Sequence, residues 1–293
     1  MYSAIRANKR NTIIIMMVFL LVIGGLGALI GYLCNDMTYA YTILVIAAMY
    51  AFIEYFFASR LAISMSGGKE ISKEDNPLLW NTVENLSIAS GMPMPRVFII
   101  DDSAPNAFAT GRNPKHAYVA ATTGLLEIMD KRELNGVMAH EMSHIQNYDI
   151  RVSMIIFGLT CAFGYVADIF LRAAIRGSRD DDGGYNIFLL VFALIAYILT
   201  PIVSLLVQLA VSRQREYLAD SSAALLTRDP QGMVNALTKL EANTKPMHRQ
   251  NSAMSHLYIN EPGKKSSFLS NIFSTHPPIS DRIARLQTIG ERM

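Results

Sequence analysis

The sequence predicts a mainly α-helical membrane protein that also contains a small β-sheet. Hydrophobic residues make up 51% of its 293 positions and charged residues only 17%, a balance more apolar than that of ordinary soluble proteins. Most of the excess lies in long apolar runs, two near the N-terminus and two after residue 151. Between the two pairs lies a segment of soluble composition with stretches rich in β-branched and aromatic residues, where we expect strands.

Each apolar run is about long enough to cross a bilayer as a helix, so the lipid bilayer is an expected partner. The runs are residues 12–33, 39–58, 152–175 and 187–211. The third is interrupted by Asp168 and Arg172, which lie four positions apart and can pair on a helix. The sequence leaves open whether residues 152–211 cross the membrane fully or re-enter it partly.

The distribution of positive charge predicts which side of the membrane the soluble part faces. Four crossings place both chain ends and the soluble segment on one side, and cytoplasmic flanks are usually the richer in Lys and Arg. That side carries Arg6, Lys9, Arg10, Arg60, Arg151, Arg213 and Arg215. On the other side, loop 35–38 has no Lys or Arg, and loop 176–185 has Arg176 and Arg179. We therefore expect the soluble part in the cytoplasm.

The soluble segment predicts helices around a short sheet. Asn76 before Pro77 is typical of a helix start, and Gly91 of a helix end. The expected elements are a helix over 77–90, a strand over 96–101, an extended segment over 106–111, a strand over 116–121 and helices over 122–129 and 131–147. The turn at 113–115 makes a hairpin of the second and third extended segments.

The helix expected over 131–147 carries a histidine motif, because residues 140–144 read His-Glu-Met-Ser-His. His140 and His144 lie four positions apart, so both imidazoles project from one helix face and can hold one Zn²⁺. Glu141 lies close enough to take a proton from a metal-bound water. The pattern is typical of zinc hydrolases, but it is short and needs a third ligand.

The third ligand is expected directly after the fourth apolar run. Glu216 and Asp220 lie four positions apart there. One carboxylate, that of Glu216, completes a two-His-one-Glu site with an open position for water, one Zn²⁺ per subunit. Asp220, one turn further, is suited to accept a hydrogen bond from a ligand imidazole and fix its tautomer. The alternative is an exposed acidic pair offset by Arg213 and Arg215.

Three motifs in this order resemble those of the HtpX membrane metalloproteases, bacterial relatives of the CAAX prenyl endopeptidases. They are residues 140–144, residues 216–220 (Glu-Tyr-Leu-Ala-Asp), and residues 275–278 (Thr-His-Pro-Pro) followed by 281–283 (Asp-Arg-Ile). The resemblance covers nearly the whole chain. It implies a multi-pass protein of the bacterial cytoplasmic (inner) membrane with a zincin-like α+β catalytic domain. It also implies a zinc endopeptidase that degrades misfolded or damaged membrane proteins, often under stress.

The site residues have expected roles. Glu141 is the expected general base, which later passes the proton to the leaving amine. In the resembled family the late motif returns towards the zinc cleft, so His276 and Arg282 are candidate catalytic donors to the scissile carbonyl. The alternative is that both merely begin an amphipathic helix.

An extended polypeptide substrate can add as a strand to an exposed sheet edge. Asn106, Ala107, Phe108 and Ala109, or else residues 118–121, are candidates to present that edge, since their small side chains allow close approach. The alternative is that both strands are paired inside the sheet.

The expected organisation has four parts. Residues 1–60 form two transmembrane helices, 61–150 the first part of the catalytic domain, 151–211 two further membrane helices, and 212–293 its second part. Two other functions stay open: a transporter subunit with a structural metal site, and an inactive membrane scaffold. A net charge of +2 gives no case for nucleic-acid binding, and the sequence indicates no oligomeric state.

Overall fold

The computed structural model describes residues 2–33, 35–162, 213–243, 245–248, 254, 257–259 and 277–291. Predictions that concern the fourth apolar run, loop 176–185, Asp168, Arg172 and His276 lie outside these residues. The described part is mainly helical with one small mixed sheet, as the sequence predicted.

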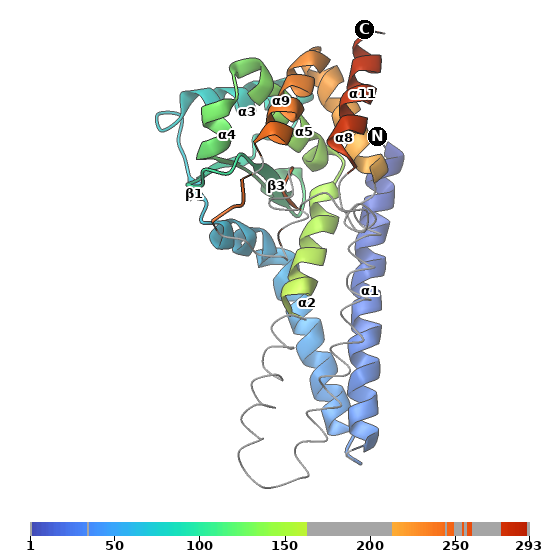
Figure 1. Ribbon diagram of the computed structural model, residues 1–293. Coiled ribbons are helices and arrows are strands. Elements are labelled where there is room, and N and C mark those ends of the chain that lie inside the picture. Colours follow the sequence, from blue (N-terminus) through green and yellow to red (C-terminus); the bar gives the residue numbers. More distant parts are fainter. Residues whose placement is uncertain are drawn as a thin grey trace.

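Two long helices, α1 (Tyr2–Leu33) and α2 (Thr38–Ser66), extend as a pair from the globular part (Figure 1). Both are long and apolar enough to cross a membrane, because an 18-residue window within Ala4–Leu29 has a mean hydropathy of 2.7 and one within Thr38–Ser66 a mean of 1.7. Large apolar side chains stand exposed on both helices, for example Leu21 and Phe52. This is the pattern expected of helices whose outer surface faces lipid.

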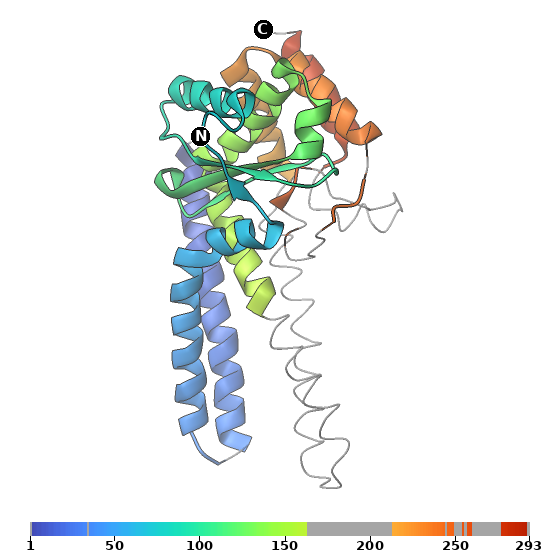
Figure 2. The same cartoon turned by 90° about the vertical axis from the view of Figure 1, so that its left-hand side faces the viewer.

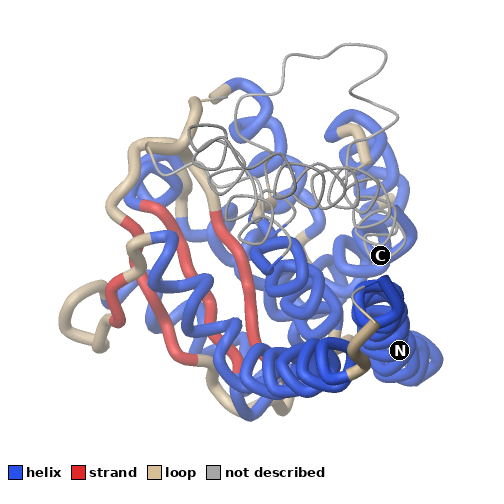
Figure 3. The backbone as a smooth tube through the Cα atoms, turned by 90° about the horizontal axis from the view of Figure 1, so that it is seen from below, coloured by secondary structure: helices blue, strands red, loops and turns tan. Residues whose placement is uncertain are grey.

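The sheet has four strands in the order β1 (Lys69–Glu70), β2 (Arg96–Ile100), β4 (Ala117–Thr122) and β3 (Ala107–Gly111). The predicted hairpin of β3 and β4 is confirmed as an antiparallel pair, with Phe108 opposite Ala120. The β2–β4 pair is parallel and the β1–β2 pair antiparallel. Figure 3 shows the strands side by side, seen along the direction of α1 and α2. Within the described residues β3 is an edge strand of this sheet.

Both faces of the sheet are buried, against different partners. Val97, Val119 and Ala109 join a core with α3 (Pro77–Ser90) and with the helices that carry the histidine and glutamate motifs. On the other face Phe98, Phe108 and Ala120 pack against the last turns of α2 and against residues 154–157. The sheet therefore lies between the helical layer and the end of α2 (Figure 2).

The helix with the histidine motif is α5 (Lys131–Gln146), and its start is fixed by a capping box. The Asp130 side chain accepts from the backbone N–H of Glu133, and the Glu133 side chain accepts from the Asp130 N–H. Glu133 also pairs with Lys239 of α9 (Pro230–Ala242) at 2.6 Å. Gly136 allows the two helices to cross closely, since a Cβ there would lie 2.9 Å from the Met233 nitrogen.

The remaining described elements complete the layer around α5. They are the 3₁₀ turn at Pro114–His116, α4 (Thr123–Ile128), α8 (Arg213–Thr227) and α11 (Ile279–Gly290). After α5 the chain turns at Tyr148, whose φ of 62° is rare outside glycine, and continues as a helix over 149–162. That helix packs against α1 and α2 through Val152, Ile155 and Leu159.

Candidate metal centre

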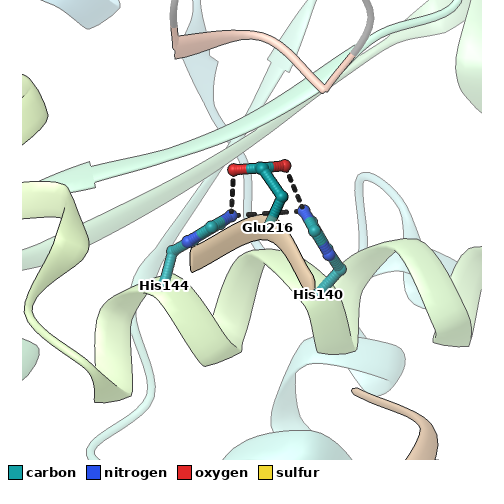
Figure 4. Close-up of side chains that lie close together, drawn as sticks. All are labelled: His140, His144 and Glu216. Carbon is teal, nitrogen blue, oxygen red and sulfur yellow. Dashed lines mark hydrogen bonds and ion pairs between the residues drawn. The ribbon is translucent and has the colours of Figure 1, made fainter. Parts of the chain in front are cut away.

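His140, His144 and Glu216 converge at the junction of α5 and α8. The Nε2 atoms of the two histidines lie 3.2 Å apart. Oε2 of Glu216 lies 3.6 Å from Nε2 of His140, and Oε1 of Glu216 lies 3.5 Å from Nε2 of His144. Figure 4 shows both imidazoles rising from one face of α5, with the carboxylate reaching them from α8. The i, i+4 spacing of the motif therefore produces the arrangement that the sequence predicted.

This donor set fits a zinc ion. Bonds of about 2.0–2.2 Å in a tetrahedral site place neighbouring ligand atoms about 3.3–3.5 Å apart. The three distances found here are close to this range, although two of them end on different oxygens of the Glu216 carboxylate. Each ring offers its Nε2 atom to the centre, because its Nδ1 atom is held by a carboxylate on the other side. The three ligand atoms belong to buried or half-buried groups on two packed helices, so the protein holds them together itself.

The His140 ring is held from the C-terminal part of the chain. Its Nδ1 atom lies 2.9 Å from the carboxylate of Asp220, one turn after Glu216 on α8. Arg282 of α11 donates to both oxygens of Asp220, at 2.9 and 2.7 Å. The same guanidinium lies 3.3 and 3.4 Å from the two ring nitrogens of His140, so it lies over the ring rather than in line with one lone pair. Arg282 is fully buried.

The His144 ring is held by a residue that the sequence did not single out. Its Nδ1 atom lies 3.0 Å from the Asp149 carboxylate, at the start of the helix over 149–162. The other Asp149 oxygen accepts a 2.6 Å hydrogen bond from the side-chain amide of Asn8 on α1. No spacing rule links Asp149 to His144, because the chain turns at Tyr148 between them.

Glu141 is buried between the two histidines on α5, and the backbone N–H of Ala109 donates to its carboxylate. Burial raises the pKa of this carboxyl, and the neighbouring histidines only partly offset that effect. A raised pKa makes the carboxylate a stronger base, as a group that takes protons near neutral pH requires. The Ala109 contact also places β3 directly beside Glu141.

The neighbours of the two histidines shift other pKa values in opposite directions. Burial lowers the pKa of His144, but Asp149 and Glu216 outweigh it and raise the pKa to about 9. Burial raises the pKa of Asp220, but Arg282 outweighs it and lowers the pKa to about 2. Asp220 is therefore ionised at any physiological pH.

The predicted substrate strand, residues 106–109, lies at the edge of the sheet, whereas β4 is paired on both sides and cannot present an edge. The backbone N–H and C=O of Phe108 face β4. Those of its neighbours Ala107 and Ala109 therefore face the outer side of β3, away from β4. There the Ala107 carbonyl accepts from the Ile259 N–H at 3.1 Å. Asn106, buried at the start of β3, hydrogen-bonds through its backbone to Thr122.

The arrangement combines a candidate zinc site, a buried carboxylate base and an edge strand, which is what hydrolysis of an extended peptide requires. Comparisons with known proteins agree with this chemistry. A model of the Peptidase family M48 matches residues 73–290. The chain is 55% identical over 292 residues to a protein of Tropheryma whipplei described as "Protease HtpX homolog", covering 100% of this chain and 99% of that protein.

A "Protease HtpX homolog" of Streptococcus gordonii is 45% identical over 296 residues, covering 98% of this chain and 99% of the relative. The crystal structure of S. mikatae Ste24p matches with a TM-score of 0.55 and 18% identity, covering 98% of this chain and 67% of that one. The structural match supports a shared fold. The family model and the two relatives settle the classification: the chain belongs to peptidase family M48 and is a metallopeptidase.

Proposed function

We propose that this protein is an integral membrane, zinc-dependent endopeptidase that cleaves misfolded or damaged membrane proteins at the cytoplasmic face. The observation that carries the proposal is the convergence of His140, His144 and Glu216 beside Glu141, with both outer ring nitrogens bound to carboxylates. A purely structural zinc site has no need of a buried Glu between its ligands. That argues against an inactive scaffold, and membership of a peptidase family argues against a transporter subunit.

When bound, Zn²⁺ supplies the Lewis acid that polarises the scissile carbonyl and makes the attacking water acidic. Glu141 takes the proton of that water and passes it to the leaving amine, and burial of its carboxyl raises its pKa for this task. The Ala109 N–H holds the carboxylate of Glu141 by a hydrogen bond. Asp220 and Asp149 hold the Nδ1 atoms and so fix the tautomer and orientation of the two ligand rings.

Arg282 and His276 have separate roles in the proposal. Both Arg282 contacts to Asp220 are short, and its Nη1 atom lies 3.9 Å from Glu216. This geometry supports a positioning role, in which Arg282 holds Asp220 and through it His140. A direct contact of Arg282 or His276 with the scissile carbonyl stays a prediction. His276→Ala tests it for that residue, since unchanged kcat would remove His276 from the catalytic account.

The substrate, in this proposal, lies along the outer side of β3 as an added strand. Main-chain hydrogen bonds along this edge need little sequence preference, which suits a peptidase that acts on damaged proteins of many kinds. The Ala107 carbonyl on this edge accepts a hydrogen bond from the Ile259 N–H, which an added substrate strand would replace.

The membrane setting rests on the exposed apolar surfaces of α1 and α2 together with the charge distribution of the sequence. Asn8 near the start of α1 touches Asp149, so the proposed site lies at the end of the membrane helices that carries the cationic flank. Labelling of cysteines introduced at positions 37 and 69, from each side of the membrane, tests the orientation. Labelling of position 69 from outside the cell would overturn it.

The decisive test of the enzyme is Glu141→Gln in the full-length protein in detergent. Chelator-sensitive cleavage of casein, and of the protein itself during purification, is expected from the wild type and is lost in the variant. Zinc content measured by metal analysis is expected to stay at one ion per chain, because Glu141 is not a ligand. Glu127→Gln, the same change at an exposed carboxylate of α4, serves as the control and keeps activity. Retained cleavage by Glu141→Gln would remove the base from the mechanism.

The substrate strand is tested by Ala107→Pro, which removes a backbone N–H and stiffens the edge. Peptide cleavage is expected to weaken through a higher KM, with zinc content unchanged. Lys69→Pro on β1, the opposite edge of the same sheet, reports what a proline costs the fold. Equal losses in both variants would mean a folding defect and not a lost substrate contact.

A further inference from the structure

The start of α1 contacts the candidate metal centre, although most of this helix is an apolar membrane segment. Asn8 is buried, and its Nδ2 donates to the Asp149 Oδ1 at 2.6 Å and to the Asn147 carbonyl at 2.9 Å. We propose that Asn8 is a positioning residue of the metallopeptidase: it fixes Asp149, and Asp149 fixes the zinc ligand His144. This inference rests on the zinc site of the proposed function.

The two carboxylate oxygens of Asp149 contact different parts of the molecule. Oδ2 lies 3.0 Å from Nδ1 of His144, on α5. Oδ1 accepts from Asn8, on α1, and lies 3.9 Å from Nε of Arg215, on α8. Because the Asn8 amide holds Oδ1, the orientation of the carboxylate is fixed and Oδ2 points to the His144 ring. The ring of His144 is thereby held with Nε2 towards Glu216.

The second hydrogen bond of the Asn8 amide fixes the backbone that carries Asp149. It reaches the Asn147 carbonyl, immediately before the turn at Tyr148. Two cations contact the Tyr148 ring: Nζ of Lys9 lies 4.5 Å and the guanidinium carbon of Arg151 lies 5.1 Å from its centroid. Two adjacent residues of α1 thus contact both sides of a turn whose positive φ is costly for a tyrosine.

A role limited to anchoring α1 would not require this chemistry. The neighbouring buried polar residue of α1, Thr12, donates to the Asn8 backbone carbonyl and so serves its own helix. Both hydrogens of the Asn8 amide, by contrast, leave α1 for the segment that follows α5. The side chains of Asn8 and Asp149 thus connect α1 to the proposed metal ligand His144.

The test measures zinc affinity of the full-length protein in detergent by competition with a fluorescent chelator. Loss of a hydrogen-bonding partner behind a ligand weakens metal binding by about 10–100-fold. Asn8 acts one residue further out, so Asn8→Leu is expected to weaken zinc binding about five- to tenfold. Asn8→Ala, which favours helix and cannot clash, is the second variant and is expected to behave alike. Thr12→Val, a change of similar size on the same helix, is expected to keep native affinity.

A double-mutant cycle separates positioning from mere stability. If Asn8 acts through Asp149, Asn8→Leu has no further effect on zinc affinity in an Asp149→Ala background. The visible absorption of the Co²⁺-loaded protein is expected to change with Asn8→Leu and not with Thr12→Val, because only the former alters ligation. Additive losses in the cycle, or equal zinc affinities of Asn8→Leu, Asn8→Ala and Thr12→Val, would overturn the inference.

The same measurement on His140→Ala keeps the two proposals apart. Loss of zinc in His140→Ala together with native affinity in Asn8→Leu would reject the role of Asn8 alone. Zinc retained at native affinity by His140→Ala would reject the metal centre on which it rests.

Discussion

The two histidines of the candidate metal centre are each held by a carboxylate, and the two carboxylates are supported by very different parts of the molecule. The residues that hold His140 come from the C-terminal part of the chain: Asp220 contacts the ring, and the buried Arg282 donates two hydrogen bonds to Asp220. On the His144 side the carboxylate is Asp149, and its close partner is the neutral amide of Asn8 on α1. His140 is 1% exposed and the side chain of His144 15%.

The difference shows how one fold meets two electrostatic demands. Beside His140 water is excluded, so a lone carboxylate would be costly and a full positive charge compensates it. Beside the partly exposed His144, the Asn8 amide fixes the Asp149 carboxylate at 2.6 Å, and the nearby cation, Arg215, lies further away at 3.9 Å. Asp149 and Glu216 together raise the pKa of His144 to about 9.

The largest expected effect comes from removing the charge on the buried side. Arg282→Leu leaves Asp220 as an unpaired buried carboxylate, which typically costs about 3–5 kcal/mol. Arg215→Leu is the matched comparison, because Arg215 lies 3.9 Å from Asp149, and it is expected to cost less than Arg282→Leu, since the Asn8 amide still holds Asp149. Thermal unfolding of both variants in detergent measures the contrast. Similar melting temperatures would contradict the asymmetry.

Neutralising Asp220 or Asp149 compares how much each carboxylate contributes to zinc affinity. Asp220→Asn and Asp149→Asn are both expected to weaken zinc binding within the range of about 10–100-fold, with Asp220→Asn at the upper end. The reason is that Asp220→Asn also removes the short-range counter-charge of the buried Arg282, whose other carboxylate, Glu216, lies at 3.9 Å. Chelator competition gives both affinities, and a larger loss in Asp149→Asn would reverse the ranking.

The smallest expected change is the change in zinc affinity for each unit of pH. Protons and Zn²⁺ compete for Nε2, and a His144 pKa of about 9 means that zinc must displace a proton up to that pH. Affinity is therefore expected to rise by about tenfold per pH unit for each proton displaced, and to keep rising between pH 7 and 9. For a histidine with its ordinary pKa of about 6.5, the rise would already have ended at pH 7.

The same shift sets a stability trend of opposite sign in chelator-treated protein. A folded pKa raised above the unfolded value stabilises the fold below about pH 6.5, and this contribution is lost as pH rises through about 9. The melting temperature without metal is thus expected to fall from pH 7 to 9. In Asp149→Asn both the pH dependence of affinity and this fall are expected to shrink.

Local patterns in the sequence predicted much of this architecture. The cap at Asn76, the strand at 96–101 and the hairpin were confirmed because each depends on neighbouring residues. His140, His144 and Glu216 could be grouped because helical spacing and a recognised motif order place them together. Which strand forms the edge could not be predicted, because the parallel pairing of β2 with β4 brings together segments that no local signal connects.

Asn8 and Asp149 were not predicted, for a physical reason. Asn8 is separated from Asp149 by 141 positions, and a lone asparagine beside an apolar run is typical of a helix start. The left-handed turn at Tyr148 removes Asp149 from the helical register of His144. Only packing of the membrane helices against the helix over 149–162 reveals the connection.

The candidate centre draws residues from α1, α5, α8 and α11, the first and last helices of the described chain among them. During synthesis on a ribosome, α1 and the histidines emerge long before Glu216, and Arg282 emerges later still. A chain that ends before Glu216 therefore holds only two of the three candidate metal ligands. We expect a chain whose α11 has not yet docked to hold zinc less tightly, because Asp220, and through it His140, then lacks the Arg282 contact.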